Sequence, residues 1–190
     1  MIKMIPKGHI IKHEIRDEIT ALEEEHNVRL STIQKILLSI NGPISTILDS
    51  LYGTVRLFML DQHVENADNE SAEILGIDEG EEIIYRESIV HKRGRPLVHV
   101  TSLIPKAKCS EQILEDLFSE KITTGRIFDE NNHETLRRIT NFSIEKPSPM
   151  LQDLFKTDED LLTREYIMIN KGTVLIWTKE AYPLSYFTIN

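Results

Sequence analysis

The chain has 190 residues, of which 40% are hydrophobic and 28% charged, a size and composition typical of one compact domain. Its 22 basic and 31 acidic residues give a net charge of -9, which argues against broad, sequence-independent binding to nucleic acid or anionic lipid. Cys109 is the single cysteine, so an intrachain disulfide and a metal site with several thiolates are excluded. Charged residues interrupt the N-terminal stretch, and no 18 consecutive residues are apolar, so we expect a cytoplasmic protein without a membrane partner.

Three helices are predicted within the first 53 residues. Apolar side chains recur there at helical spacing, and the predicted helices span 13–26, 31–40 and 44–51. The second helix is expected to end at Asn41-Gly42, because this pair tolerates the positive φ of a helix C-cap. Pro43 follows, and its fixed φ favours the start of the third helix. Residues 1–53 are therefore interpreted as the helical part of a single domain that spans 1–190.

After residue 53 the hydrophobic period changes to two, the period of a strand. Strands are predicted at 54–64, 82–91, 96–104, 164–169 and 173–182, with a short sixth strand at 142–145. Between them we predict short helices and one loop, at 69–75, 110–118 and 148–155 for the helices and 123–128 for the loop. Two consecutive hairpins require an antiparallel sheet whose apolar face the helices cover, so 54–190 is interpreted as a sheet with inserted helices in an α+β domain.

Most familiar catalytic motifs are missing from the sequence. It has no GxGxxG, GxxxxGK[ST], HExxH, GxSxG or CxxC, which leaves dinucleotide-binding, P-loop, zincin and α/β-hydrolase functions without support. No metal site is predicted either, because the histidines do not form a metal-ligand spacing on a common face. We interpret all seven as structural residues: His9, His13, His26, His63, His91, His99 and His133.

Two charged residues stand on strand faces that are otherwise largely apolar. Side chains alternate along a strand, which places Arg86 on the face of Ile84 and Val90. The same alternation places Glu180 on the face of Ile176. Burying either charge alone is costly. We therefore expect the two either to form a salt bridge or to face a cavity in which a ligand completes the charge balance.

Four segments of the chain are informative together: LLSINGPISTIL, IIYRESIVHKRGRPLVHVTSLIP, TTGRIF and LTREYIMINKGTVLIWTKEAYPLSYF. In order and with compatible spacing, they resemble the chorismate pyruvate-lyase family, and above all its divergent branch in archaea and mycobacteria. The resemblance covers nearly the whole chain after Leu30. No single motif is highly specific, and the serial agreement of the four carries the resemblance. It implies a six-stranded antiparallel sheet with helices and loop flaps that enclose an internal ligand cavity.

The resemblance also implies site residues. The strand arginine of the family corresponds to Arg86 in YRES, and the glutamate near the end of its last strand corresponds to Glu180 in TKEAYP. Both are implied to be catalytic and to bind the substrate. The two flap residues, implied to bind the substrate as well, correspond to Ile44 in NGPIS and Thr124 in TTGRI. The sequence departs from the family at Thr124, where leucine is common, and at Lys179, where a small residue is commoner.

The implied reaction is the cofactor-free removal of the enolpyruvyl group of chorismate as pyruvate, which leaves 4-hydroxybenzoate. The ring becomes aromatic as the ether C–O bond breaks, so the protein mainly needs to position a dianion, exclude water and manage one proton. On this hypothesis Arg86 binds a carboxylate through its guanidinium fork, and Glu180 hydrogen-bonds the ring oxygen or handles the proton. The candidates for a second carboxylate are Arg56, Arg126 and Arg164. The hypothesis requires a dry chamber large enough for one benzoate-sized molecule.

Two other functions remain open at this point. The ligand domains of GntR-type repressors share the implied sheet, which makes a non-catalytic sensor of hydroxybenzoate-like molecules the main alternative to a lyase. A repressor needs a winged helix upstream of this sheet, and the first 53 residues lack a wing hairpin and carry acidic or apolar helices. We therefore expect no nucleic-acid partner. An interaction module with an emptied cavity is the third interpretation.

Overall fold

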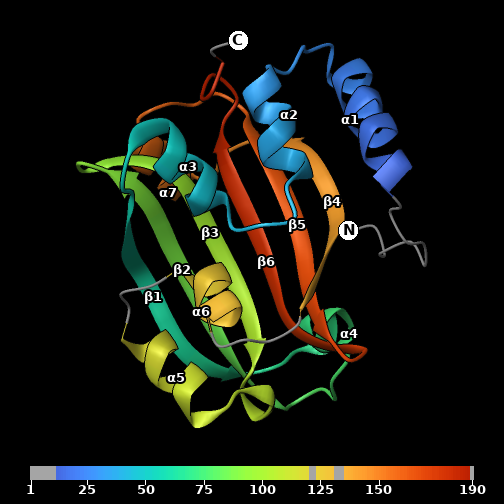
Figure 1. The fold of residues 1–190 in the computed structure, drawn as a ribbon, viewed down its shortest axis with the longest axis vertical. Coiled ribbons are helices and arrows are strands. Elements are labelled where there is room, and N and C mark those ends of the chain that lie inside the picture. Colours follow the sequence, from blue (N-terminus) through green and yellow to red (C-terminus); the bar gives the residue numbers. More distant parts are fainter. Residues whose placement is uncertain (1–11, 120–122, 131–134, 189–190) are drawn as a thin grey trace.

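The computed structural model describes residues 12–119, 123–130 and 135–188 (Figure 1). Six strands form one antiparallel sheet in the order β1-β2-β3-β6-β5-β4. The strands are β1 (Arg56–Asn66), β2 (Glu82–Lys92), β3 (Arg95–Pro105), β4 (Leu136–Glu145), β5 (Leu161–Asn170) and β6 (Thr173–Pro183). The helices are α1 (Lys12–His26), α2 (Thr32–Ser39), α3 (Ile44–Tyr52), α4 (Asn69–Leu75), α5 (Glu111–Phe118), α6 (Thr124–Glu130) and α7 (Pro149–Phe155), with a short 3-10 helix at Lys106–Lys108. The predicted α+β class and six-stranded antiparallel sheet are confirmed.

Two tight hairpins, β2-β3 and β5-β6, form the centre of the sheet. Each turns through two residues of positive φ, Arg93-Gly94 in the first and Lys171-Gly172 in the second. Such turns match the right-handed twist of the flanking strands, and glycine takes the second position without steric cost. Pairing of β3 with β6 joins the hairpins, which leaves β1 and β4 as the two edge strands.

The sheet has a helix-covered front face and a partly open back face. Figure 1 shows α2, α3 and α6 in front of the sheet, and α7 behind it. Two apolar clusters fill the front. The first joins α1, α2 and α3 to one half of the sheet and includes Leu22, Leu37, Leu48, Val98 and Leu162. The second joins α5 and α6 to the other half and includes Ile104, Ile113, Leu117, Ile127 and Met168.

On the back face, two short helices cover opposite ends of the sheet. Leu75 of α4 packs with Ile83, and Phe155 of α7 packs with Leu161. The expectation that the helices cover a single apolar face is thus incomplete. The reason is that some strand side chains that project to the back face, Ile83 among them, are apolar and buried, so helices must pack on that face too.

Three local predictions differ from the structure. Residues 124–130 form α6 rather than a loop, because Ile127 and Phe128 are buried, and tertiary packing stabilises a helix too short to form alone. Strand β4 begins at Leu136, six residues before the predicted start. Neither Asn41 nor Gly42 has a positive φ, and α2 instead ends with Ile40 in an extended conformation.

Candidate functional site

A belt of polar side chains crosses the front face between the two apolar clusters. Its members come from four neighbouring strands, and none has more than 3% of its surface exposed. They are Arg86 and Ser88 on β2, Ser102 on β3, Thr178 and Glu180 on β6, and Arg164 on β5. Their common orientation follows from strand register, in which paired residues of adjacent strands project to the same face. Because burying polar groups costs free energy that apolar residues would not, this belt is the candidate site.

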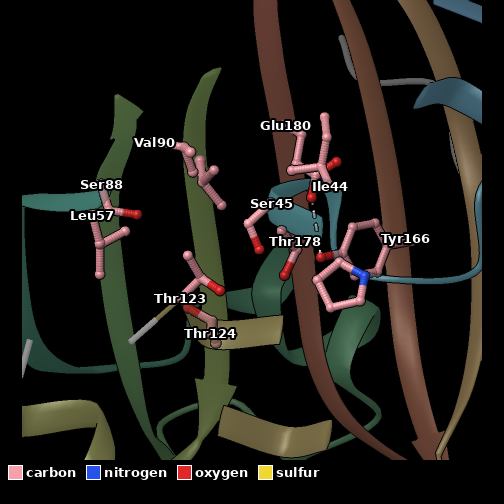
Figure 2. Close-up of a pocket in the computed structure, with 12 residues that line it drawn as sticks. Ile44, Ser45, Leu57, Ser88, Val90, Thr123, Thr124, Tyr166, Thr178 and Glu180 are labelled. Atoms are coloured by element: carbon pink, nitrogen blue, oxygen red, sulfur yellow. Dashed lines mark hydrogen bonds between the residues drawn. The ribbon is translucent and has the colours of Figure 1, made fainter. Parts of the chain in front are cut away.

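Glu180 and Arg164 form an ion pair within the belt. The two residues are register partners, and Arg164 donates to Oε2 of Glu180 from Nε at 3.0 Å and from Nη2 at 2.6 Å. Its Nη1 donates to the carbonyl oxygen of Ile40 at 2.9 Å. Tyr166 donates its hydroxyl to the second carboxylate oxygen, Oε1, at 3.3 Å (Figure 2). The ion pair therefore fixes Oε2, while Oε1 receives one long hydrogen bond from the described residues.

Tyr166 is a neutral donor in this arrangement. Burial, and after it the nearby charge of Glu180, raise the pKa of Tyr166 to about 12, against the opposing effect of two arginines. Those arginines approach the ring: Cζ of Arg137 lies 4.9 Å from the ring centroid, and Cζ of Arg164 lies 5.2 Å from it. Near pH 7 the phenol consequently keeps its proton and serves as a hydrogen-bond donor.

A small cavity lies between the belt and the helices α3 and α6 (Figure 2). Its lining combines an apolar group of residues with a group that presents hydroxyl or carboxylate oxygens. The apolar residues are Pro43, Ile44, Leu57, Val90 and Val100. The polar residues are Ser45, Ser88, Thr123, Thr124, Tyr166, Thr178 and Glu180. Glu180 is the one charged side chain among the described residues of this lining, so a ligand would meet many hydroxyl groups and one carboxylate from that part of the chain.

The volume of this cavity is about 20 Å³, which is space for about one water molecule. The expectation of a chamber for a benzoate-sized molecule is therefore not met by this cavity. Ile44 in the first turn of α3 and Thr124 in the first turn of α6 are both buried and occupy the space above the sheet. An aromatic ligand could enter here only if these helices moved away from the sheet.

Three of the four predicted site residues meet at this cavity. Ile44, Thr124 and Glu180 line it, each from a different element. Arg86 lies on the same sheet face but is not among the lining residues, and its Nη1 donates to the carbonyl oxygen of Leu117 in α5 at 3.2 Å. The sequence left two possibilities for Arg86 and Glu180, a salt bridge with each other or a cavity that both face. Glu180 does form a salt bridge, but its partner is Arg164 and not Arg86.

The three arginines considered for a second carboxylate have different positions. Arg164 belongs to the belt. Arg126 forms an ion pair with Asp49, which lies on α3. Arg56 is exposed at the start of the edge strand β1. Arg164 alone among them reaches the candidate site, and its charge is already matched by Glu180.

The two departures from the family pattern also fall in different places. Thr124 lines the cavity with 5% of its surface exposed, so its side chain bears directly on what the cavity accepts. Lys179 projects to the back face, where its Nζ lies 2.7 Å from Oε1 of Glu145. The departure at Lys179 therefore leaves the lining of the cavity unchanged.

Several residues at or beside this site were not identified by the sequence analysis, among them Ser45, Tyr166 and Arg137. Ser45 lines the cavity, is 1% exposed, and its Oγ has no hydrogen-bond partner among the described residues. The sequence signal that could have identified Ser45 was its place in the first turn of the predicted helix 44–51, next to the predicted site residue Ile44. Tyr166 shares its strand face with Arg164, so alternation could have identified it. Arg137 falls in the part of β4 that the predicted strand 142–145 omits.

The described part of the chain holds neither a cluster of metal ligands nor a helix suited to a membrane. Within 12–119, 123–130 and 135–188, no group of three or more His, Cys, Asp or Glu side chains could hold a metal ion. No helix in those ranges has the length and apolar character needed to cross a membrane. His9 and His133 lie outside the described residues, as does the side chain of His13.

Comparison with known proteins places the chain in a family. The family model described as "Chorismate pyruvate-lyase Rv2949c-like" matches residues 38–189. The chain belongs to this family. A protein of Methanocaldococcus jannaschii named "Putative lyase MJ0807" is 30% identical over 156 residues, which cover 78% of this chain and 77% of that protein. The family predicted from the four sequence segments is therefore confirmed.

Solved structures share the fold of this family member at low sequence identity. The effector domain of PhnF from Mycobacterium smegmatis superposes with a TM-score of 0.63 and 13% identity, over 75% of this chain and 88% of that one. A GntR-family transcriptional regulator from Bacillus cereus gives a TM-score of 0.57 and 14% identity, over 72% of this chain and 96% of that one. These likenesses show a common fold and leave the activity to be argued from the site.

Proposed function

We propose that this chain is a chorismate lyase, which removes the enolpyruvyl group of chorismate as pyruvate and leaves 4-hydroxybenzoate without a cofactor. The observation that carries the proposal is the buried carboxylate of Glu180, held by Arg164 at the wall of a hydroxyl-rich cavity. Membership of a family described as chorismate pyruvate-lyase supports it. A fixed carboxylate with one lightly bonded oxygen suits a ligand that brings a hydroxyl group.

The proposed reaction asks little covalent chemistry of the protein. The ether bond between the ring and the enolpyruvyl oxygen breaks, and the neighbouring ring carbon loses its proton, whose C–H electrons complete the aromatic ring. The C–O electron pair leaves with enolpyruvate, which takes up a proton and becomes pyruvate. Since aromatisation supplies the driving force, the protein contributes orientation, exclusion of water and a path for one proton.

We assign the two predicted catalytic residues to opposite ends of the substrate ring. Oε1 of Glu180 accepts from the ring hydroxyl, because Oε2 is already occupied by Arg164. Arg86 binds the ring carboxylate through its guanidinium fork. Their strands, β6 and β2, are separated by β3 alone. Arg86 is in register with Ser102 and Thr178, so Glu180 lies two strands across and two residues along from it. Steps of about 10 Å and about 7 Å put the two main-chain positions about 12 Å apart, a span that leaves room for a para-substituted benzoate between the two side chains.

The flap residues explain how such a ligand is enclosed. Ile44 and Thr124 cover the cavity from α3 and α6, and substrate binding displaces these helices from the sheet. Ser45 then meets the ligand with a hydroxyl that has no partner among the described residues of the closed form. A polar group without a partner in the empty state is available for a ligand at no cost in lost hydrogen bonds.

Mixing the purified chain with chorismate tests the proposal. We expect equimolar pyruvate and 4-hydroxybenzoate, measured by coupled reduction of pyruvate and by ultraviolet absorbance. Glu180→Gln should lower turnover by about 100-fold or more. Glu165→Gln, on the back face of the neighbouring strand, is the matched control and should stay within about twofold of the wild type. Absence of both products with the wild-type chain would overturn the proposal.

Two variants then separate the roles of the residues. Arg86→Lys should sharply reduce turnover in a folded protein, because an ammonium group cannot reproduce a bidentate fork. Retained turnover would remove Arg86 from the substrate site. Glu180→Gln with weakened 4-hydroxybenzoate binding supports the hydroxyl contact assigned above, whereas retained affinity with lost turnover would reassign Glu180 to proton handling.

A non-catalytic sensor is the second candidate function. The likeness to the effector domain of PhnF favours it. The two candidates differ in one measurement. Tight binding of 4-hydroxybenzoate, seen by calorimetry, without any pyruvate release from chorismate would identify a sensor.

A further inference from the structure

Arg137 is a buried guanidinium group that has no carboxylate partner among the described residues. Only 7% of the residue is exposed. Its Nη1 donates to the carbonyl oxygen of Asn41 at 2.6 Å, and its Nη2 lies 3.6 Å from Sδ of Met168. Its Cζ lies 4.9 Å from the ring centroid of Tyr166, and its Nε is buried without a hydrogen-bond partner. All of these neighbours are neutral, so among the described residues dipoles and an aromatic ring solvate the positive charge.

Arg164 is a second buried arginine beside Tyr166, and its charge is neutralised by a carboxylate. Both guanidinium groups lie near the ring of Tyr166, and each donates to a main-chain carbonyl of the segment between α2 and α3. Arg164 also donates twice to Glu180, and Arg137 does not. Among the described residues, the charges of Arg137, Arg164 and Glu180 around Tyr166 sum to one positive charge. A buried charge without a counter-charge is costly, so an anion bound near Arg137 would reduce that cost.

The excess charge adjoins the cavity. Tyr166 contacts Arg137 with its ring and lines the cavity beside Glu180. Asn41, which accepts the hydrogen bond from Arg137, precedes by two residues the segment Pro43-Ile44 that forms the cavity wall. Arg137 thus fixes part of that wall and places a cation one aromatic ring away from the ligand space. The charge of Arg137 still acts on a ligand across one aromatic ring, because the dielectric constant of a protein interior is lower than that of water.

We propose that Arg137 is a specificity-determining residue whose charge favours a dianionic ligand over a monoanionic one in this cavity. The inference rests on the proposed function and deepens it. Chorismate carries two carboxylates, whereas 4-hydroxybenzoate carries one. Arg86 binds the carboxylate of the ring, and Arg137 offsets the carboxylate of the enolpyruvyl group. The same preference assists release of the aromatic product, since half of the negative charge departs with pyruvate.

The test compares the two ligands in three variants of the full chain. Arg137→Met should raise the KM for chorismate on the order of tenfold, the size expected for one charge beyond hydrogen-bond reach. It should change the inhibition constant of 4-hydroxybenzoate by less than about threefold. Arg137→Lys, which keeps the charge and can donate to Asn41, should restore the preference for chorismate. Arg138→Met, on the adjacent residue of the opposite face, is the control and should match the wild type.

The outcomes distinguish this inference from the proposed function. If the wild type turns chorismate over and Arg137→Met weakens both ligands equally, Arg137 is a structural residue and only this inference fails. If Arg137→Lys also loses the preference for chorismate over 4-hydroxybenzoate, Arg137 is again a structural residue and only this inference fails. If the wild type releases no pyruvate, the lyase proposal fails, and calorimetric dissociation constants for intact chorismate replace KM in the same comparison. Equal affinity changes for the two ligands would then overturn the inference.

Discussion

The two faces of the sheet carry ion pairs of nearly equal length in different surroundings. On the front face Arg164 and Glu180 approach to 2.6 Å with 1% and 3% of their side chains exposed. On the back face Lys179 and Glu145 approach to 2.7 Å with 29% and 40% exposed. The distance between the charges therefore says little about their contribution. Burial decides how far the free energy of unfolding falls when one partner is removed. Water solvates the remaining charge on the back face and cannot do so on the front face.

The front pair should show the largest effect of any single ion pair in the sheet. Arg164→Met leaves Glu180 buried without its cation, so the free energy of unfolding should fall by about 3–5 kcal/mol. Urea denaturation followed by circular dichroism measures this loss. The double variant Arg164→Met, Glu180→Met should recover most of it, because no lone charge then remains buried. A double variant as unstable as the single one would contradict this account of the front face.

His99 on the back face should produce a smaller, pH-dependent effect. Burial lowers the pKa of His99 from its usual value of 6.5, against the bond of 2.7 Å to Glu87, which raises it. The unfolded chain then binds the proton more tightly, so the contribution of neutral His99 is complete above pH 6.5 and declines as the pH falls below it. We expect the free energy of unfolding to fall less between pH 7.5 and 5.5 in His99→Gln than in the wild type. Identical slopes in the two proteins would contradict a buried neutral histidine.

Lys179 should give the smallest effect. The bond from Lys179 lowers the pKa of Glu145, although burial opposes the shift, so an attraction exists. Because both side chains reach water, Lys179→Met should change the free energy of unfolding by no more than about 1 kcal/mol. The difference should shrink further in 1 M salt, which screens exposed charges. A loss comparable to that of Arg164→Met would erase the contrast between the two faces.

The site was predictable where it depended on alternation along a strand. Alternation placed Arg86 and Glu180 inside, and both are buried on the front face. Alternation by itself did not name the partner of Glu180, because that depends on the register within the second hairpin, where Arg164 lies opposite Glu180. The order of the two hairpins in the sheet, which their sequences do not reveal, placed Arg86 two strands away from Glu180.

The misses share one physical cause. Helix α6 has seven residues and an internal glycine, so its local sequence favours a helix only weakly. The first half of β4 has two adjacent arginines, which hide the strand alternation. Arg137 turns inward over Tyr166 and Arg138 turns to the other face, a division that only the neighbouring strand imposes. Contacts between distant segments outweighed weak local preferences at both places.

Local patterns alone determined the class of the fold, because hairpin turns, helix caps and the period of apolar residues act over a few neighbours in the chain. The same patterns identified two of the buried charged residues, Arg86 and Glu180, and missed Arg137 and Arg164. Tertiary structure decided how those charges are matched, how little space the closed cavity offers, and that Arg137 keeps a charge with no carboxylate beside it among the described residues. Electrostatic balance and free volume depend on side chains brought together from separate elements, and no stretch of sequence contains that information.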